Sequence, residues 1–135
     1  MIHQYLLKLP ALPRGFHIID KFIFDSIKAW PEEGLLNIFL QHTSAALAIN
    51  EGADPDVRSD LETIFNDLVP ESRHYKHSQE GPDDMPSHAK AILAGSSLNI
   101  PIRDKKLALG RWQSIYLCEF RDHGGSRNIL LTLLS

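Results

Sequence analysis

Short apolar segments of strand length, separated by proline and glycine, run along most of this 135-residue chain. Such segments predict β-strands over residues 2–9, 16–19, 35–41, 45–50, 98–102 and 128–134. Residues 107–121 predict one long strand or a bent pair of strands around Gly110. The apolar run over residues 35–41 is nearly continuous, so we expect that strand to be buried on both faces.

Three stretches with apolar residues at helical spacing interrupt these strands. Asp20 is expected to cap a helix over residues 21–29. Asp54-Pro55 is an N-cap residue followed by proline, which starts a helix that Pro70 ends. A third helix is expected from about residue 84 to Gly95. Strands dominate, which predicts an α+β fold: a compact single domain over residues 1–135 with a mostly antiparallel β-sheet and inserted helices.

Composition excludes several classes of protein. The net charge is −3 and the pI about 6.1, so nucleic acid is not expected as a partner, because its binders rely on a basic surface. Cys118 is the single cysteine, which excludes an intrachain disulfide and zinc sites built on several cysteines. No apolar stretch reaches transmembrane length and no signal peptide is visible. We therefore expect no membrane partner and a reducing, cytoplasmic setting.

A polar stretch over residues 75–88 breaks the strand pattern and runs into the third helix. Long irregular connections in small domains are often functional. His77 and His88 lie in this polar stretch, and His42 ends an apolar strand. Three histidines with an open fourth position are typical of catalytic zinc sites, so these three are candidate metal ligands. Their spacing matches no local motif, which leaves hydrogen-bonded structural histidines as the alternative, and His74 is an alternative to His77.

Carboxylates and arginines supply the other candidate site residues. Asp83 and Asp84 precede the third helix, where we expect one to cap it and the other to be a metal ligand, an orienting partner of a histidine, or a base. Glu119 and Arg121 share one face of a strand, as an exposed ion pair or as a base and an anion clamp. Arg127 follows a Gly-Gly turn and is a second candidate phosphate contact, with an exposed turn residue as the alternative.

Alternation along the strand at 45–50 predicts a small polar face beside His42. Ala45, Leu47 and Ile49 are expected to point into the core. The opposite face then leaves room for a ligand or a neighbouring chain; it carries His42, Ser44, Ala46, Ala48 and Asn50. Ser44 and Asn50, together with Asp83 before the third helix, are candidate ligand-binding residues.

Several segments together, spread over nearly the whole chain, resemble one family. The segments are Gln41 to Leu47, Asn50-Glu51, Asp54 to Asp60, His77 with Glu80 to Lys90, Ser96 to Ile102, Leu109 to Gln113, and Glu119 to Arg127. In these segments the chain resembles the YjbQ-like proteins, a family also labelled secondary thiamine-phosphate synthase.

The resemblance implies a homotrimer with histidines and acids clustered near a subunit boundary, where relatives hold a metal. It also implies a weak thiamine-phosphate synthase activity, and it supports site roles for His42, His77, His88, Asp83, Asp84, Glu119, Arg121 and Arg127. Two residues depart from the family pattern. Lys105 stands where a turn glycine is usual, and Arg111 stands where threonine usually precedes Trp-Gln.

These observations lead us to expect an enzyme that uses a divalent metal, zinc, bound by His42, His77 and His88. Its partner would be a small phosphorylated molecule, and Glu119, Asp84, Arg121 and Arg127 would carry the catalysis. Both a thiamine-phosphate synthase-like transferase, which expels pyrophosphate, and a metal-dependent hydrolase fit these residues. The alternative is a non-catalytic trimer that binds a metal or an anion in the same pocket.

Overall fold

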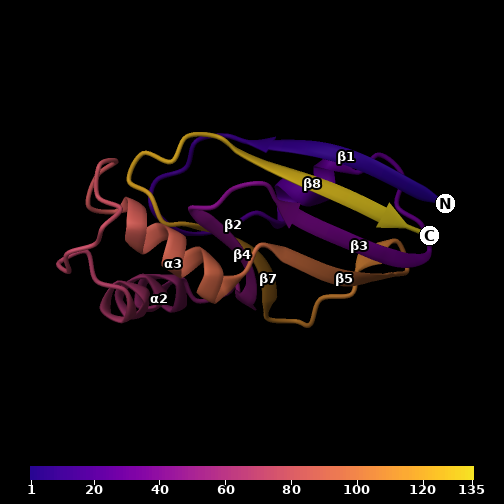
Figure 1. The fold of residues 1–135 in the computed structure, drawn as a ribbon. Coiled ribbons are helices and arrows are strands. Elements are labelled where there is room, and N and C mark those ends of the chain that lie inside the picture. The colour runs from indigo at the N-terminus through magenta and orange to yellow at the C-terminus, as the bar shows by residue number, and fades with distance from the viewer.

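The computed structural model describes all 135 residues, and its strands form two separate sheets (Figure 1). The five-stranded sheet has the order β1 (Ile2–Leu9), β8 (Arg127–Leu134), β3 (Glu33–Leu40), β5 (Ser97–Arg103) and β6 (Lys106–Leu107). The three-stranded sheet has the order β2 (Gly15–Ile18), β7 (Gln113–Glu119) and β4 (Ala45–Glu51). All strand pairs are antiparallel, which confirms the predicted α+β class.

Three helices are inserted between the strands: α1 (Asp20–Ser26), α2 (Pro55–Leu68) and α3 (Asp84–Ala94). The Asp54 carboxylate accepts a hydrogen bond of 2.9 Å from the Asp56 N–H, which confirms it as the cap of α2. The prediction for Asp20 is wrong: Ile19 occupies the N-cap position of α1, and Asp20 Oδ1 instead accepts the Ile115 N–H at 2.6 Å. None of the three helices is long and apolar enough to span a membrane.

The inner faces of the two sheets and one side of α1 form the main core. A second apolar cluster lies on the other face of the three-stranded sheet, where Phe16, Tyr116 and Phe120 pack with Ala46 of β4. Leu61 and Phe65 of α2 and Ala94 of α3 pack against it. The small face of β4 is therefore filled by this aromatic cluster, which overturns the expectation that it leaves room for a ligand. Cys118 lies in the same cluster as a packed thiol, and burial raises its pKa to about 12.

Long-range contacts correct two strand predictions in part. In β3, Leu36, Ile38 and Leu40 are buried while Leu35 and Phe39 are 37% and 42% exposed, because no helix packs on the outer face of the five-stranded sheet. Residues 107–121 are not one strand but, as in the predicted alternative, two strands on either side of Gly110. The two strands belong to different sheets: β6 pairs with β5, and β7 lies between β2 and β4.

Candidate metal site and pocket

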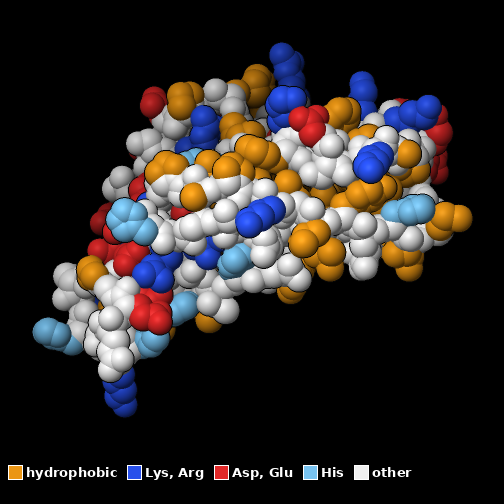
Figure 2. All heavy atoms as spheres, turned by 90° about the horizontal axis from the view of Figure 1, so that it is seen from above, with side chains coloured by type: hydrophobic (Ala, Val, Ile, Leu, Met, Phe, Trp, Pro, Cys, Tyr) orange, Lys and Arg blue, Asp and Glu red, His pale blue; other side chains and the backbone are white.

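His77, from the polar stretch before α3, lies against the side of α3 that carries Asp84 and His88. Asp84 and His88 are four residues apart on α3 and therefore share a face of the helix. His77 Nε2 lies 2.5 Å from Asp84 Oδ2, and His88 Nε2 lies 3.4 Å from the same oxygen. The three donor atoms lie within 4.8 Å of one another, so these residues form a group that is able to hold a metal ion. Figure 2 shows histidine side chains gathered at the end of the molecule that carries α2, α3 and the polar stretch.

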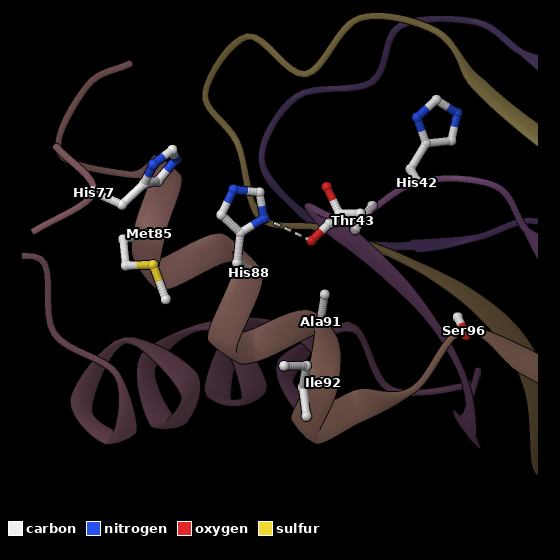
Figure 3. A pocket seen from close by; sticks show the side chains of 9 residues that line it. His42, Thr43, His77, Met85, His88, Ala91, Ile92 and Ser96 are labelled. Carbon is white, nitrogen blue, oxygen red and sulfur yellow. Dashed lines mark hydrogen bonds between the residues drawn. The ribbon is translucent and has the colours of Figure 1, made fainter. Parts of the chain in front are cut away.

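In His88 and Asp84, the polar atom that faces away from the group is hydrogen-bonded to the protein. His88 Nδ1–H donates to the Thr43 carbonyl at 2.9 Å (Figure 3), which leaves Nε2 with its lone pair. Arg121 Nη1 donates to Asp84 Oδ1 at 2.7 Å, which leaves Oδ2 toward the histidines. Metal-binding histidines and carboxylates are oriented in this way, by a hydrogen bond on the atom that does not bind the ion.

The spacing of one donor pair, His88 and Asp84, fits a small divalent ion. Two ligands about 2.1 Å from a tetrahedral zinc ion lie roughly 3.4 Å apart, which is the spacing of His88 Nε2 and Asp84 Oδ2. The 2.5 Å contact between His77 and Asp84 is instead a hydrogen bond. His77 must therefore give up its Nε2 proton to bind an ion, and its half-exposed side chain has the freedom to shift.

Asp84 is almost fully buried and still ionised. Burial alone would raise its pKa, but the hydrogen bond from His77 and the positive charge of Arg121 act against burial, and the pKa lies below its usual value. Asp83 occupies the N-cap position of α3 without making a cap hydrogen bond. Its carboxylate accepts hydrogen bonds from Arg121 Nε at 3.0 Å and from the Asp122 N–H at 2.9 Å, so it holds the chain after β7. Asp83, a predicted ligand-binding residue, does not line the cavity that adjoins the metal-binding group.

His42 is not part of the metal-binding group; Asp84 is the third member in its place. The backbone N–H of Asn128 donates to His42 Nε2 at 2.7 Å, so the ring proton lies on Nδ1 and neither nitrogen has a free lone pair. Burial and the positive charge of Arg127 lower the pKa of His42. His42 is thus a neutral imidazole with one N–H to offer.

The other predicted catalytic residues form buried ion pairs. Arg127 donates from Nε and Nη2 to the two oxygens of Glu119, at 2.7 and 2.6 Å, and both side chains are buried. Arg121 has one hydrogen bond from each nitrogen: Nε to Asp83, Nη1 to Asp84, and Nη2 to the Glu80 carbonyl at 3.0 Å. Neither arginine presents a free guanidinium to a phosphate group.

Ser44 and Asn50, predicted to bind a ligand, lie outside the cavity that adjoins the metal-binding group. Ser44 is buried, and its carbonyl accepts Arg127 Nη2 at 3.3 Å. Asn50 is exposed near the far end of β4, where its Oδ1 accepts the Glu51 N–H at 2.8 Å.

The cavity itself has a volume of about 560 Å³, within the range of small-molecule sites (Figure 3). One wall is a single face of α3 and the opposite wall is the chain between β3 and β4. Its lining comprises His42, Thr43, Ala45, His77, Met85, His88, Ala91, Ile92 and Ser96. His74 lines a neighbouring hollow of about 340 Å³, which shares His77 and Met85 with this cavity, and His74 is not in the metal-binding group.

Sequence reasoning missed Thr43, Met85 and Ile92 as lining residues. Met85, His88 and Ile92 recur at helical spacing, so a face of α3 was readable once the start of the helix was known. The same spacing distinguishes Asp84 from Asp83, because only Asp84 lies four residues before His88.

Comparisons with known proteins agree with this fold. The sequence matches the family described as "UPF0047 protein YjbQ-like" over residues 7–135. A UPF0047 protein YjbQ of Salmonella typhimurium is 48% identical over 135 residues, with 98% of each chain covered. Among solved structures, a conserved hypothetical protein from Thermus thermophilus is 32% identical with a TM-score of 0.85, covering 96% of this chain and 98% of its own. A YjbQ/UPF0047 protein of Clostridium acetobutylicum is 31% identical with a TM-score of 0.82, covering 98% and 99%.

Proposed function

This chain belongs to the UPF0047 YjbQ-like family, and from its site we propose that it is a metal-dependent enzyme acting on a small molecule. His77, Asp84 and His88 would hold a divalent ion, for which we propose zinc. The observation that carries the proposal is the orientation of the donor atoms. The Thr43 carbonyl binds Nδ1–H of His88 and leaves Nε2 free, and Arg121 binds Oδ1 of Asp84 and leaves Oδ2 toward the histidines. Two imidazoles and one carboxylate with an open side are a typical catalytic zinc ligand set.

A zinc ion held by these three residues would supply Lewis acidity, with which it would activate water and polarise a substrate oxygen. His42 lines the same cavity with a neutral ring whose Nδ1–H is free to donate. In a hydrolysis, water adds to the electrophilic atom, the bond to the leaving group breaks, and a proton of the water goes to the leaving group. His42 would donate its hydrogen bond to the oxygen on which negative charge develops.

Hydrolysis fits this site better than the thiamine-phosphate synthase-like transfer. Release of pyrophosphate requires cations that hold its charged oxygens. The two arginines expected in that role, Arg121 and Arg127, are bonded to Asp83, Asp84 and Glu119. A non-catalytic metal-binding trimer uses the same ligands, so turnover decides between the two functions.

The test begins with metal content. Purified protein dialysed against zinc is expected to retain about one ion per chain by elemental analysis, and Asp84→Asn and His88→Ala are each expected to lose it. His74→Ala is the matched control, because His74 lies in the neighbouring hollow, outside the metal-binding group. Full zinc retention by Asp84→Asn and His88→Ala would contradict the site.

Turnover is tested with the same proteins on a panel of esters, amides and phosphate esters. We expect hydrolysis that dipicolinate abolishes and added zinc restores, and that Asp84→Asn lacks. Zinc binding without turnover of any compound would favour the non-catalytic alternative.

We also propose that the protein is a homotrimer whose contact surface is the outer face of the five-stranded sheet. Strand register aligns Ile2, Leu134 and Leu35 in one apolar row across that face, and Leu6, Leu130 and Phe39 in another. Ile2 and Leu6 are 65% and 66% exposed. Large exposed apolar surfaces are typical of contacts with another chain.

A further inference from the structure

The cavity beside the proposed metal site has no lysine, arginine, aspartate or glutamate side chain in its lining. Ala45, Met85, Ala91 and Ile92 supply its apolar surface. Met85 offers a flexible thioether that adapts to irregular apolar shapes. Apart from the metal-binding group, the polar side chains of the lining are neutral: His42, Thr43 and Ser96.

The two arginines beside Asp84 and His42 already have carboxylate partners. Each nitrogen of Arg121 already donates to Asp83, Asp84 or the Glu80 carbonyl. Arg127 is 4% exposed and bonded to both oxygens of its partner carboxylate.

The start of α3 is also unsuited to an anion, although helix N-termini often bind phosphate. The Asp84 N–H donates to the Gly81 carbonyl at 3.3 Å, and the Ser87 N–H donates to the Asp83 carbonyl at 3.0 Å. Two carboxylates stand at this end of the helix, and their charge repels an anion. Outside the metal-binding group, the one side-chain N–H of the lining is Nδ1–H of His42, and it is unpaired.

We propose, on the basis of the metal site proposed above, that this cavity takes a small, uncharged and mainly apolar molecule. Such a molecule presents a single oxygen to the metal-binding group and lays its hydrocarbon part along Met85, Ala91 and Ile92. A phosphorylated molecule would place further charged oxygens against methyl and thioether groups, and burying a charge without a partner is costly. This substrate class differs from the phosphorylated one expected from the sequence.

The apolar part of the inference is tested on cobalt-loaded protein with two hydroxamates that differ only in chain length. Hexanohydroxamate is expected to perturb the cobalt absorption spectrum at a concentration at least tenfold lower than acetohydroxamate, because each buried methylene strengthens binding by roughly fourfold. Ile92→Lys is expected to remove most of this gain. Leu93→Lys is the matched control, since Leu93 is the adjacent exposed residue and lies outside the lining. Equal affinity for the two hydroxamates would overturn the proposal.

The uncharged part is tested on metal-free protein with hexanamide and hexyl phosphate. We expect hexanamide to shift the backbone amide signals of Ala91 and Ile92 at concentrations at least several-fold lower than hexyl phosphate does. Tighter binding of hexyl phosphate would overturn the proposal whether or not a metal binds. If the protein binds neither cobalt nor zinc, the proposed metal-dependent enzyme is wrong. The measurement on metal-free protein then still decides which class of ligand the cavity binds.

Discussion

The ring of His42 is held neutral because burial, the nearby charge of Arg127 and the Asn128 N–H all disfavour a second proton. Its folded pKa lies below the ordinary value of 6.5, so the stabilisation it gives is complete above pH 6.5 and is lost as the pH falls through the folded pKa. His42→Gln keeps an acceptor for Asn128 but does not titrate. Between pH 8 and pH 5 we expect wild type to lose about 1 kcal/mol more unfolding free energy than His42→Gln, the value of one hydrogen bond, by urea denaturation. Parallel losses in the two proteins would contradict this role.

Lys105 shows the cost of a departure from the family pattern at a single turn. Asp104 and Lys105 both have left-handed backbone, with φ of 53° and 62°, a conformation that glycine adopts more easily. The Lys105–Glu32 contact of 3.5 Å is exposed and contributes little. Lys105→Gly is therefore expected to raise the unfolding free energy by about 0.5–1 kcal/mol in urea. Lys106→Gly, in the adjacent strand, is the control and is expected to lower it; a loss in Lys105→Gly would show that the turn is not strained.

At the scale of elements, the Glu119–Arg127 pair joins the end of β7 to the start of β8 across the two sheets. Arg127→Met leaves Glu119 buried without a partner, which is expected to cost about 3–5 kcal/mol of unfolding free energy. Lys21→Ala breaks the exposed Lys21–Asp25 pair on α1 and is expected to cost less than about 0.5 kcal/mol. Similar losses for the two variants in urea would show that the buried pair does not fix the sheets.

Local signals predicted the elements well where the decisive interaction lies within a few residues. Asp54-Pro55 started α2 as expected because an N-cap bond spans two residues. The one-sided burial of β3, and the division of residues 107–121 between two sheets, depend on strands that are distant in the sequence. The same holds for the site. The polar stretch was recognised from the sequence, but the hydrogen bond from the Asn128 N–H to His42 and the ion pair between Arg127 and Glu119 join residues that are distant in the sequence or lie on different strands.

At the scale of the whole molecule, the bare outer face of the five-stranded sheet is the surface on which the proposed trimer depends. Leu6 and Phe39 belong to the same apolar row from two different strands, and they are 66% and 42% exposed. Charging both positions, in Leu6→Lys/Phe39→Lys, places like charges in a contact that would bury them without partners. Because both side chains point away from the core, the fold itself is expected to persist, with an unchanged circular dichroism spectrum.

Light scattering during size-exclusion chromatography measures the outcome. Wild type is expected to have the mass of three 15.2 kDa chains, and the double variant the mass of one. Ile64→Lys, which adds the same charge at a half-exposed apolar position of α2, is expected to leave the trimer intact. If the double variant is still a trimer, the contact surface lies on another face, such as the one with the exposed Ile92 and Leu93 of α3. If the wild type is a monomer, the proposed trimer is wrong.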